Sequence, residues 1–332
     1  MLIEQPTWTY KSGRSLCQWY GHVQLVAHKV LGQWVCLDLY SGQRLWQRRY
    51  RRPNTVVGVG KEVIVATEMR SDRAWTLTFG CYGISLETGD LLWTSHAKRP
   101  WSWFLRCFDF VPRFTNGLRD AAVGVRGSRC VCESGRVLDI RSGREVGRAR
   151  DVEAWRPVSL GDSDKQSPAE RLYYSQLGGE PSLVEIGEGK FLTHRWGGES
   201  SPAEPLGQQF QLFLVKDRQH LQWRFGIGDS GKYIDGNYFS YRYAGDCVYM
   251  LISDQPQFQP VGSMKALSVK PNATKFQIWT LDLGTGTIVQ KIPVTDGNVL
   301  NCRIEDINDG HLLISIEGKT LLCYQRRSRS SA

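Results

Sequence analysis

The stretch that decides the fold is WVCLDLYSGQRLW, residues 34–46, where an apolar run, a Ser-Gly pair and a second apolar run follow one another. Leu37 and Leu39 are two residues apart, so on an extended strand their side chains lie on one face and can be buried together. Gly42 can adopt the positive φ that a tight hairpin needs and that a β-carbon would penalise. The stretch therefore predicts two antiparallel strands joined by a short turn.

The same pattern returns along the chain, at YGISLETGDLLW (82–93), GRVLDIRSGREVG (135–147), QLFLVKDRQHLQW (211–223) and IWTLDLGTGTIVQ (278–290). A further segment, HLLISIEGKTLLCYQ (311–325), supplies two strands at the C-terminus. The residues that share one slot are Asp38, Asp139 and Asp282, then Gly42, Gly89, Gly143 and Gly286, and finally Trp46 and Trp93. The aspartate can accept amide hydrogens of the turn, and the tryptophan is expected to cover the edge of the neighbouring unit.

The spacing of the repeats predicts their architecture. The glycines at 42, 89 and 143 are 47 and 54 residues apart, close to the roughly 40–50 residues of one four-stranded propeller blade. A single repeat cannot bury both of its faces, so copies must lie side by side. We therefore expect an all-β chain folded as a single β-propeller of six or seven four-stranded antiparallel blades. N- and C-terminal strands mixed in one blade would close the ring and satisfy both edges.

The expected propeller occupies residues 1–325, and residues 326–332 are expected to form a basic disordered tail. The expected blades lie roughly at 14–50, 54–96, 103–150, 151–226 (as one blade or two), 233–293, and 298–325 together with 1–10. Insertions are expected around 161–170 and 197–207.

The pattern L-D-x-x-[ST]-G-x-x-x-W resembles the repeat of the quinoprotein-like propellers, also called PQQ-like repeats, over roughly 14–226 and 233–325. The resemblance implies the fold, and the group includes non-catalytic assembly factors and scaffolds. Its quinone enzymes typically carry an adjacent Cys-Cys pair and a calcium ion. This sequence has no adjacent cysteines, so we expect a scaffold-type member with no quinone, cofactor or metal.

Composition excludes several classes of protein. With 41% hydrophobic and 11% aromatic residues the chain can bury a core, so it is not disordered. No window approaches eighteen consecutive apolar residues, and the first residues contain Glu4 and no apolar signal region. Most of the nine cysteines lie in apolar runs, and there is no CxxC motif. We therefore expect a cytoplasmic chain with buried, reduced thiols.

Catalytic motifs are missing from the sequence. The six histidines are scattered, without HExxH or paired-ligand spacing. A propeller can nevertheless build a site from loops that are distant in sequence, so an enzyme or small-ligand binder stays a third hypothesis. The expectation is that the chain is not an enzyme.

Charge is concentrated in the first half of the chain. Residues 1–160 contain 24 basic and 14 acidic residues, whereas residues 161–332 contain 18 and 19. Two arginine-rich segments follow the turns of the first and third repeats and are expected to lie in register on outer strands. They comprise Arg44, Arg48, Arg49, Arg51 and Arg52, and then Arg141, Arg144, Arg148 and Arg150.

Two interpretations of these segments stay open at the level of sequence. Exposed arginines on an outer strand can simply block edge-to-edge pairing of sheets. Alternatively they form a docking surface, and we expect a protein partner first, with a nucleic acid as the second candidate because guanidinium groups bind phosphates. The aromatic segment RPWSWFLRCFDF (99–110) is expected to pack between blades, with an exposed anchor patch as the alternative. The sequence thus predicts a protein-interaction platform whose basic half carries the interface.

Overall fold

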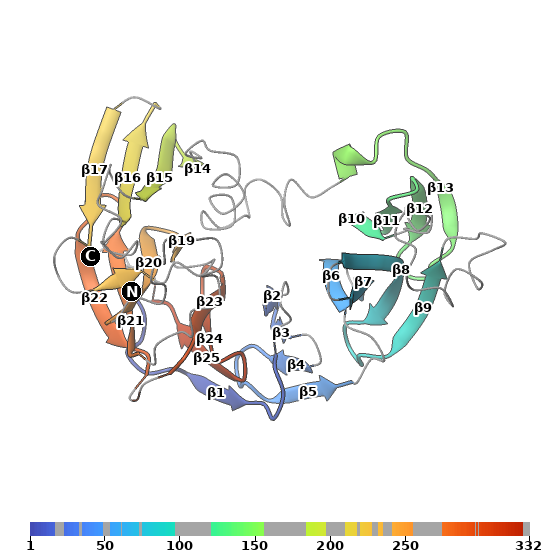
Figure 1. Cartoon of the computed structure of the whole chain (residues 1–332), viewed down its shortest axis with the longest axis horizontal. Helices are drawn as coiled ribbons and strands as arrows, with labels where there is room; N and C mark the ends of the chain where they lie inside the picture. Colours follow the sequence, from blue (N-terminus) through green and yellow to red (C-terminus); the bar gives the residue numbers. More distant parts are fainter. Residues whose placement is uncertain are drawn as a thin grey trace. The chain divides into compact units, whose positions relative to one another are not determined.

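The computed structural model describes residues 1–16, 23–32, 35–48, 54–60, 62–72, 75–96, 121–155, 184–196, 210–217, 220–227, 232–234, 241–254, 274–295, 297 and 299–327. In these residues the chain forms 25 β-strands and one short 3-10 helix, η1 (Glu153–Trp155). The strands build six antiparallel sheets, five with four strands and one with five (Figure 1). Six such sheets, formed almost entirely from consecutive strands, are consistent with a β-propeller.

The chain divides into two compact units, and each contains three of the sheets. The second unit comprises residues 16–39 and 43–163. Its first sheet contains β2 (Gln24–Val26), β3 (Lys29–Leu31), β4 (Val35–Asp38) and β5 (Arg44–Gln47). Its second contains β6 (Asn54–Val59), β7 (Val63–Asp72), β8 (Trp75–Ser85) and β9 (Leu91–His96). Its third contains β10 (Ala122–Arg126), β11 (Arg129–Cys132), β12 (Arg136–Asp139) and β13 (Glu145–Arg148).

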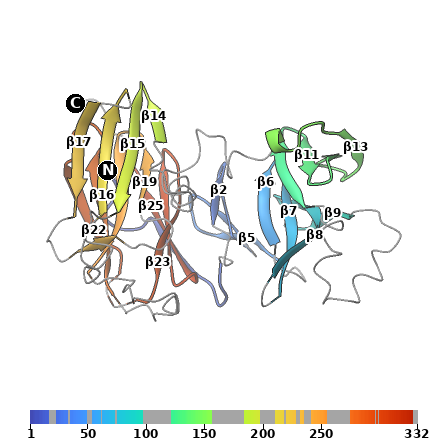
Figure 2. The same cartoon turned by 45° about the horizontal axis from the view of Figure 1, so that its top comes forward.

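The first unit comprises residues 1–15, 40–42 and 164–332. One sheet contains β14 (Val184–Gly187), β15 (Lys190–Trp196), β16 (Phe210–Lys216) and β17 (His220–Gly226), which run side by side in Figures 1 and 2. The five-stranded sheet contains β18 (Tyr233–Ile234), β19 (Tyr241–Ala244), β20 (Cys247–Ser253), β21 (Phe276–Asp282) and β22 (Ile288–Pro293). The last sheet contains β23 (Cys302–Ile307), β24 (His311–Ile316), β25 (Thr320–Gln325) and β1 (Trp8–Lys11).

Both ends of the chain contribute to the same sheet, as the sequence predicted. β1 pairs antiparallel with β25, with Trp8 opposite Cys323 and Lys11 opposite Thr320. The Met1 amino group donates to the Arg327 carbonyl oxygen, and Arg327 N–H donates to the Met1 carbonyl oxygen. Each terminal strand thereby covers backbone groups that would otherwise form an open edge.

One sequence expectation about the C-terminus is wrong. Arg326 was placed in a disordered tail, but its side chain is only 9% exposed. Its guanidinium donates to Tyr249 Oη at 3.0 Å, to the Ala244 carbonyl oxygen at 2.7 Å and to the Asn308 carbonyl oxygen. Arginine has five fixed donors, so it can connect three such acceptors at once, which a sequence pattern alone does not reveal. Residues 328–332 lie outside the described part of the chain.

The turns of the repeats have the predicted geometry. Gly42, Gly89, Gly143 and Gly286 have φ between +67° and +72°. In the third repeat the Asp139 carboxylate accepts hydrogen bonds from Ser142 N–H at 2.9 Å and from Ser142 Oγ at 2.7 Å. Because these donors favour the charged form, with the Ser142 hydroxyl contributing most, the pKa of Asp139 lies below its usual value.

Tryptophans on outer strands dock on these glycine turns, also as predicted. Trp93 on β9 places its ring against Gly143, where a β-carbon would lie 2.5 Å from Cδ2, and its Nε1 donates to the Ile140 carbonyl oxygen at 2.7 Å. Trp46 on β5 makes the equivalent contacts with Gly89 and the Leu86 carbonyl oxygen. Trp223 on β17 repeats the arrangement on the turn at Gly286, and Trp8 on β1 lies against Gly42. Only glycine leaves room for the indole at these turns, so each sheet is held to the next by the same contact.

A β-bulge precedes the docking position on each of these outer strands. The register shifts between Cys36 and Leu37 opposite β5, and the same shift occurs where β9, β13, β17 and β22 pair with their neighbours. A bulge inserts one extra residue and re-aims the side chain that follows it. The docking slot after the bulge contains Trp46, Trp93, Gly147, Trp223 and Gln290 in the five sheets.

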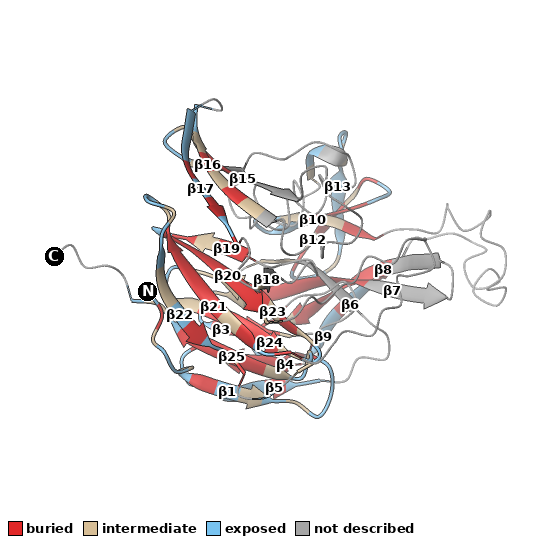
Figure 3. Ribbon diagram, turned by 60° about the vertical axis from the view of Figure 1, so that its left-hand side comes forward, coloured by how far each residue is buried: buried red, intermediate tan, exposed pale blue. Residues whose placement is uncertain are grey.

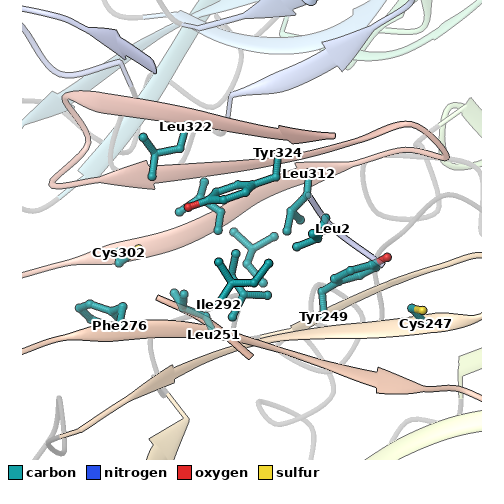
Figure 4. Packing of buried hydrophobic residues seen from close by; sticks show 13 residues of the cluster. Leu2, Cys247, Tyr249, Leu251, Phe276, Ile292, Cys302, Leu312, Leu322 and Tyr324 are labelled. Atoms are coloured by element: carbon teal, nitrogen blue, oxygen red, sulfur yellow. The ribbon is translucent and has the colours of Figure 1, made fainter. Parts of the chain in front are cut away.

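Gln290 replaces tryptophan with a polar contact. Its side-chain amide accepts from Leu2 N–H and donates to the Leu2 carbonyl oxygen, both at 2.9 Å. Leu2 itself belongs to a core cluster that also contains Tyr249, Phe276, Ile292 and Tyr324 (Figure 4). The glutamine therefore fastens the start of the chain to its unit.

The core lies within and between the sheets of each unit. Every residue of β20 is buried, as is every residue of β21 except one of intermediate exposure, and both strands are largely red in Figure 3. The seven described cysteines are buried and not in disulfides, as expected for small apolar side chains: Cys36, Cys81, Cys130, Cys132, Cys247, Cys302 and Cys323. Burial raises the pKa of the Cys36 and Cys323 thiols to about 12.

Candidate interaction surface

The described arginines of the first segment lie on the outer strand β5 and just beyond it. Arg44 and Arg48 are exposed, whereas Arg49, Arg51 and Arg52 lie outside the described residues. Arg48 Nε donates to Asp90 Oδ1 at 3.1 Å, and Arg44 Nη1 donates to Gln47 Oε1 at 2.7 Å. Hydrogen bonding to Thr88 and the charge of Arg48 hold the pKa of Asp90 below its usual value. The two arginines of this segment that are described thus have partners within the second unit.

The second segment lies on the turn before β13, on β13 and just after it. Arg141, Arg144, Arg148 and Arg150 are all exposed. Arg141 Nη2 lies 3.5 Å from Glu62 Oε2, and Arg148 Nε lies 3.8 Å from Glu145 Oε1. Glu145 is shared, because Arg136 Nε donates to its other oxygen at 2.9 Å.

Arg144 and Arg150 have no ion-pair partner among the residues that the structure describes. Exposed ion pairs contribute little to stability, about 0–1 kcal/mol, so these arginines are not explained by folding. The second segment consequently presents more unbalanced positive charge than the described part of the first.

The expectation that the two segments lie in register is wrong in detail. Arg44 stands opposite Leu37, and the equivalent position in the third sheet, opposite Leu138, is occupied by Glu145. The arginines share the outer strand but not its positions, because the same bulge aligns Trp46 with Gly147. Each segment is therefore a separate surface feature.

The outer strands also expose apolar side chains. The large ones are Leu45, Leu91, Leu92, Val146, Leu221 and Ile288, at 37–57% exposure. β13 differs from the others, because all four of its residues are exposed, whereas β5, β9, β17 and β22 each bury at least one (Figure 3). Sequence reasoning missed Gly147, whose signal was the departure from tryptophan at a repeated slot.

Other chemistry predicted from the sequence has no assembled site in the described residues. Within those ranges no group of three or more His, Cys, Asp or Glu side chains lies close enough to hold a metal ion. Among them, too, no helix is long and apolar enough to cross a membrane. The aromatic segment 99–110 and the insertions at 161–170 and 197–207 fall outside the described part of the chain.

Some buried polar groups were not anticipated. Lys29 on β3 is buried and donates to the carboxylate of Glu87 in the next sheet, and Glu305 on β23 accepts from Ser315 Oγ. Cys81 Sγ and Cys132 Sγ, from neighbouring sheets, lie 3.7 Å apart. These groups are satisfied inside their units, as buried polar groups generally are, and present nothing at the surface.

Comparison with solved structures finds distant likenesses only. BamB from Moraxella catarrhalis is 11% identical, with a TM-score of 0.27 over 95% of this chain and 85% of that one. The computationally designed Ika8 protein is 10% identical, with a TM-score of 0.28 over 95% and 100% of the two chains. A chain of the mitotic checkpoint complex is 9% identical, with a TM-score of 0.35 over 99% and 94%.

No protein-family model matches the sequence, and no curated protein matches it. Because the three TM-scores lie below 0.5, the fold is defined by strand order and register alone.

Proposed function

We propose that this chain is a non-enzymatic interaction platform, a scaffold subunit of a cytoplasmic assembly that docks protein partners. We take it to be a single closed propeller of the PQQ-like type, with six or seven blades and no quinone, cofactor or metal. The observation that carries the proposal is the second arginine segment, which exposes four arginines on a sheet whose interior strand β11 is buried. A rigid sheet that displays charge in this way can bind an acidic partner without changing shape.

The arrangement favours protein over nucleic acid in one respect. Exposed apolar side chains such as Val146 and Leu45 lie on the same outer strands as the arginines. Protein interfaces combine arginine with apolar contacts, whereas binding dominated by phosphates depends on charge and is lost steeply with added salt.

The test is affinity purification of the tagged chain from its native extract, with and without nuclease, followed by mass spectrometry. The proposal predicts a stoichiometric protein partner that remains after nuclease treatment. Recovery that depends on nucleic acid would replace it with a nucleic-acid-associated role, and a bound small molecule with turnover would replace it with a catalytic one.

Charge reversal then locates the interface. One variant reverses Arg144, Arg148 and Arg150, and a second reverses Arg48, Arg49, Arg51 and Arg52. If both variants retain every partner at the affinity of the unaltered chain, the basic half does not carry the interface.

A further inference from the structure

Gly147 occupies the one docking slot of the described outer strands that contains no side chain. The slots of the other four sheets contain Trp46, Trp93, Trp223 and Gln290, and each of these contacts a neighbouring segment. Glycine in the middle of a strand costs stability, because it loses more conformational freedom than other residues and has nothing to bury.

None of the usual reasons for a strand glycine applies at this position. Its φ is not among the positive values that favour glycine, and a β-carbon placed there would meet no atom within 4 Å. The bulge does not require glycine either, because the same bulge precedes Trp46 on β5 and Trp93 on β9. The remaining reason is that another backbone approaches the strand closely.

The backbone of β13 is available for such an approach. Among the described strands β13 pairs only with β12. Ala149 N–H donates to the Gly135 carbonyl oxygen, and Arg148 stands opposite Arg136 at the next position. Hydrogen-bonding direction alternates along an antiparallel pair, so the N–H and C=O of Arg148 face away from β12.

The side chains around this edge specify the charge of the visitor. Arg148 is 76% exposed and shares its one acidic neighbour, Glu145, with Arg136. Arg144 and Arg150 lie at the two ends of the strand without an ion-pair partner among the described residues. A strand that carries carboxylates would neutralise this charge, and apolar residues between them would cover Val146.

We propose that β13 binds an extended, acidic segment of a partner protein, which adds as a further strand to the β10–β13 sheet and passes over Gly147. This inference rests on the proposed platform function and names its binding edge and the chemistry of its partner. Backbone pairing supplies affinity in this mode, and the alternating side chains supply specificity.

The experiment uses a phage-displayed library of random ten-residue peptides, selected on the full chain and counter-selected on the Gly147→Leu variant. A leucine here has space in the folded chain but blocks the approach of a second backbone. The expected peptides alternate Asp or Glu with Val, Ile or Thr. A selection that yields no peptide, or peptides without acidic enrichment, overturns the proposal.

Fluorescence anisotropy with the most enriched peptide then separates strand pairing from charge. Binding is expected to weaken at least about tenfold, equivalent to about 1.4 kcal/mol, with Gly147→Leu, with Arg148→Glu, and when the peptide amides are N-methylated. The matched controls Gly13→Leu, at another glycine with open space, and Arg224→Glu, on the outer strand β17, are expected to bind normally. Equal affinity for the N-methylated peptide or for Gly147→Leu would mean adhesion by charge alone and overturns the proposal.

The outcome is distinguishable from failure of the platform function itself. If affinity purification recovers a nuclease-resistant partner and Gly147→Leu recovers it equally well, the platform stands and the β13 edge is wrong. If no partner is recovered with either protein, the platform is wrong.

Discussion

The contact between Trp93 and the Gly143 turn makes a quantitative prediction about how neighbouring sheets are held together. Trp93 is buried, its indole N–H donates to the Ile140 carbonyl oxygen, and its ring fills the space where a Gly143 side chain would lie. Trp93→Ala should lower the free energy of unfolding by about 3–5 kcal/mol, since it removes a large buried ring and leaves a carbonyl unpaired.

The second perturbation is Gly143→Ala, which places a methyl group 2.5 Å from Trp93 Cδ2 at a φ of +67°. The left-handed backbone costs about 1–2 kcal/mol for alanine, and the overlap with the indole adds about 1–3 kcal/mol. When Trp93 is already alanine, only the backbone cost remains. The two substitutions should therefore show a coupling free energy of about 1–3 kcal/mol.

The assay is urea denaturation of the four proteins of this cycle, followed by far-UV circular dichroism because one tryptophan is absent from two of them. Gly127→Ala is the matched control, since Gly127 also has a positive φ, +57°, but no atom within 4 Å of its β-carbon position. It should cost the same with and without Trp93. Effects of Gly143→Ala that are equal in both backgrounds, within about 0.5 kcal/mol, would refute the docking argument.

Three further predictions concern other contacts of the structure. Gln290→Ala should lower stability by about 1–3 kcal/mol in urea denaturation, because it removes both hydrogen bonds to the Leu2 backbone, and an unchanged midpoint would contradict this contact. Since Ser142 lowers the folded pKa of Asp139, its stabilising contribution is present above the ordinary aspartate pKa and is lost as pH falls through the folded value. Asp139→Asn should therefore flatten the acid limb of thermal stability against pH, and an unchanged limb would count against this assignment. Because the pKa of Cys323 is about 12, iodoacetamide at pH 8 should leave its peptide unmodified in the native protein and label it after unfolding, as mass spectrometry will detect.

The repeat pattern predicts local structure well wherever one residue type has one mechanical use. The glycines at the turns, the aspartate before the turn at Gly143, and Trp46 and Trp93 all do what the pattern indicated, because a positive φ and a docked indole leave little choice. The pairing of both chain ends in one sheet was also predictable, since a lone strand such as TWTYKSG at the start needs a partner. The order of strands within each sheet then follows from the order of the repeats.

Contacts between residues distant in sequence could not be predicted in the same way. Arg326 looks like the start of a basic tail, and only the fold brings Tyr249, Ala244 and Asn308 within reach of its guanidinium. The bulges are likewise invisible in the sequence, yet they decide which outer-strand residues align. They separate Arg44 from the arginines of the third repeat and place Gly147 in a tryptophan slot.

The most direct test of the platform function is the mass of the native particle. The chain, purified from its native extract by affinity tag after nuclease treatment, would be measured by size-exclusion chromatography with light scattering. The proposal predicts a defined complex that exceeds the 37.7 kDa of the chain by the mass of a stoichiometric partner whose identity mass spectrometry then supplies. A particle of 37.7 kDa, or a whole-number multiple of it without another protein, would contradict the proposal.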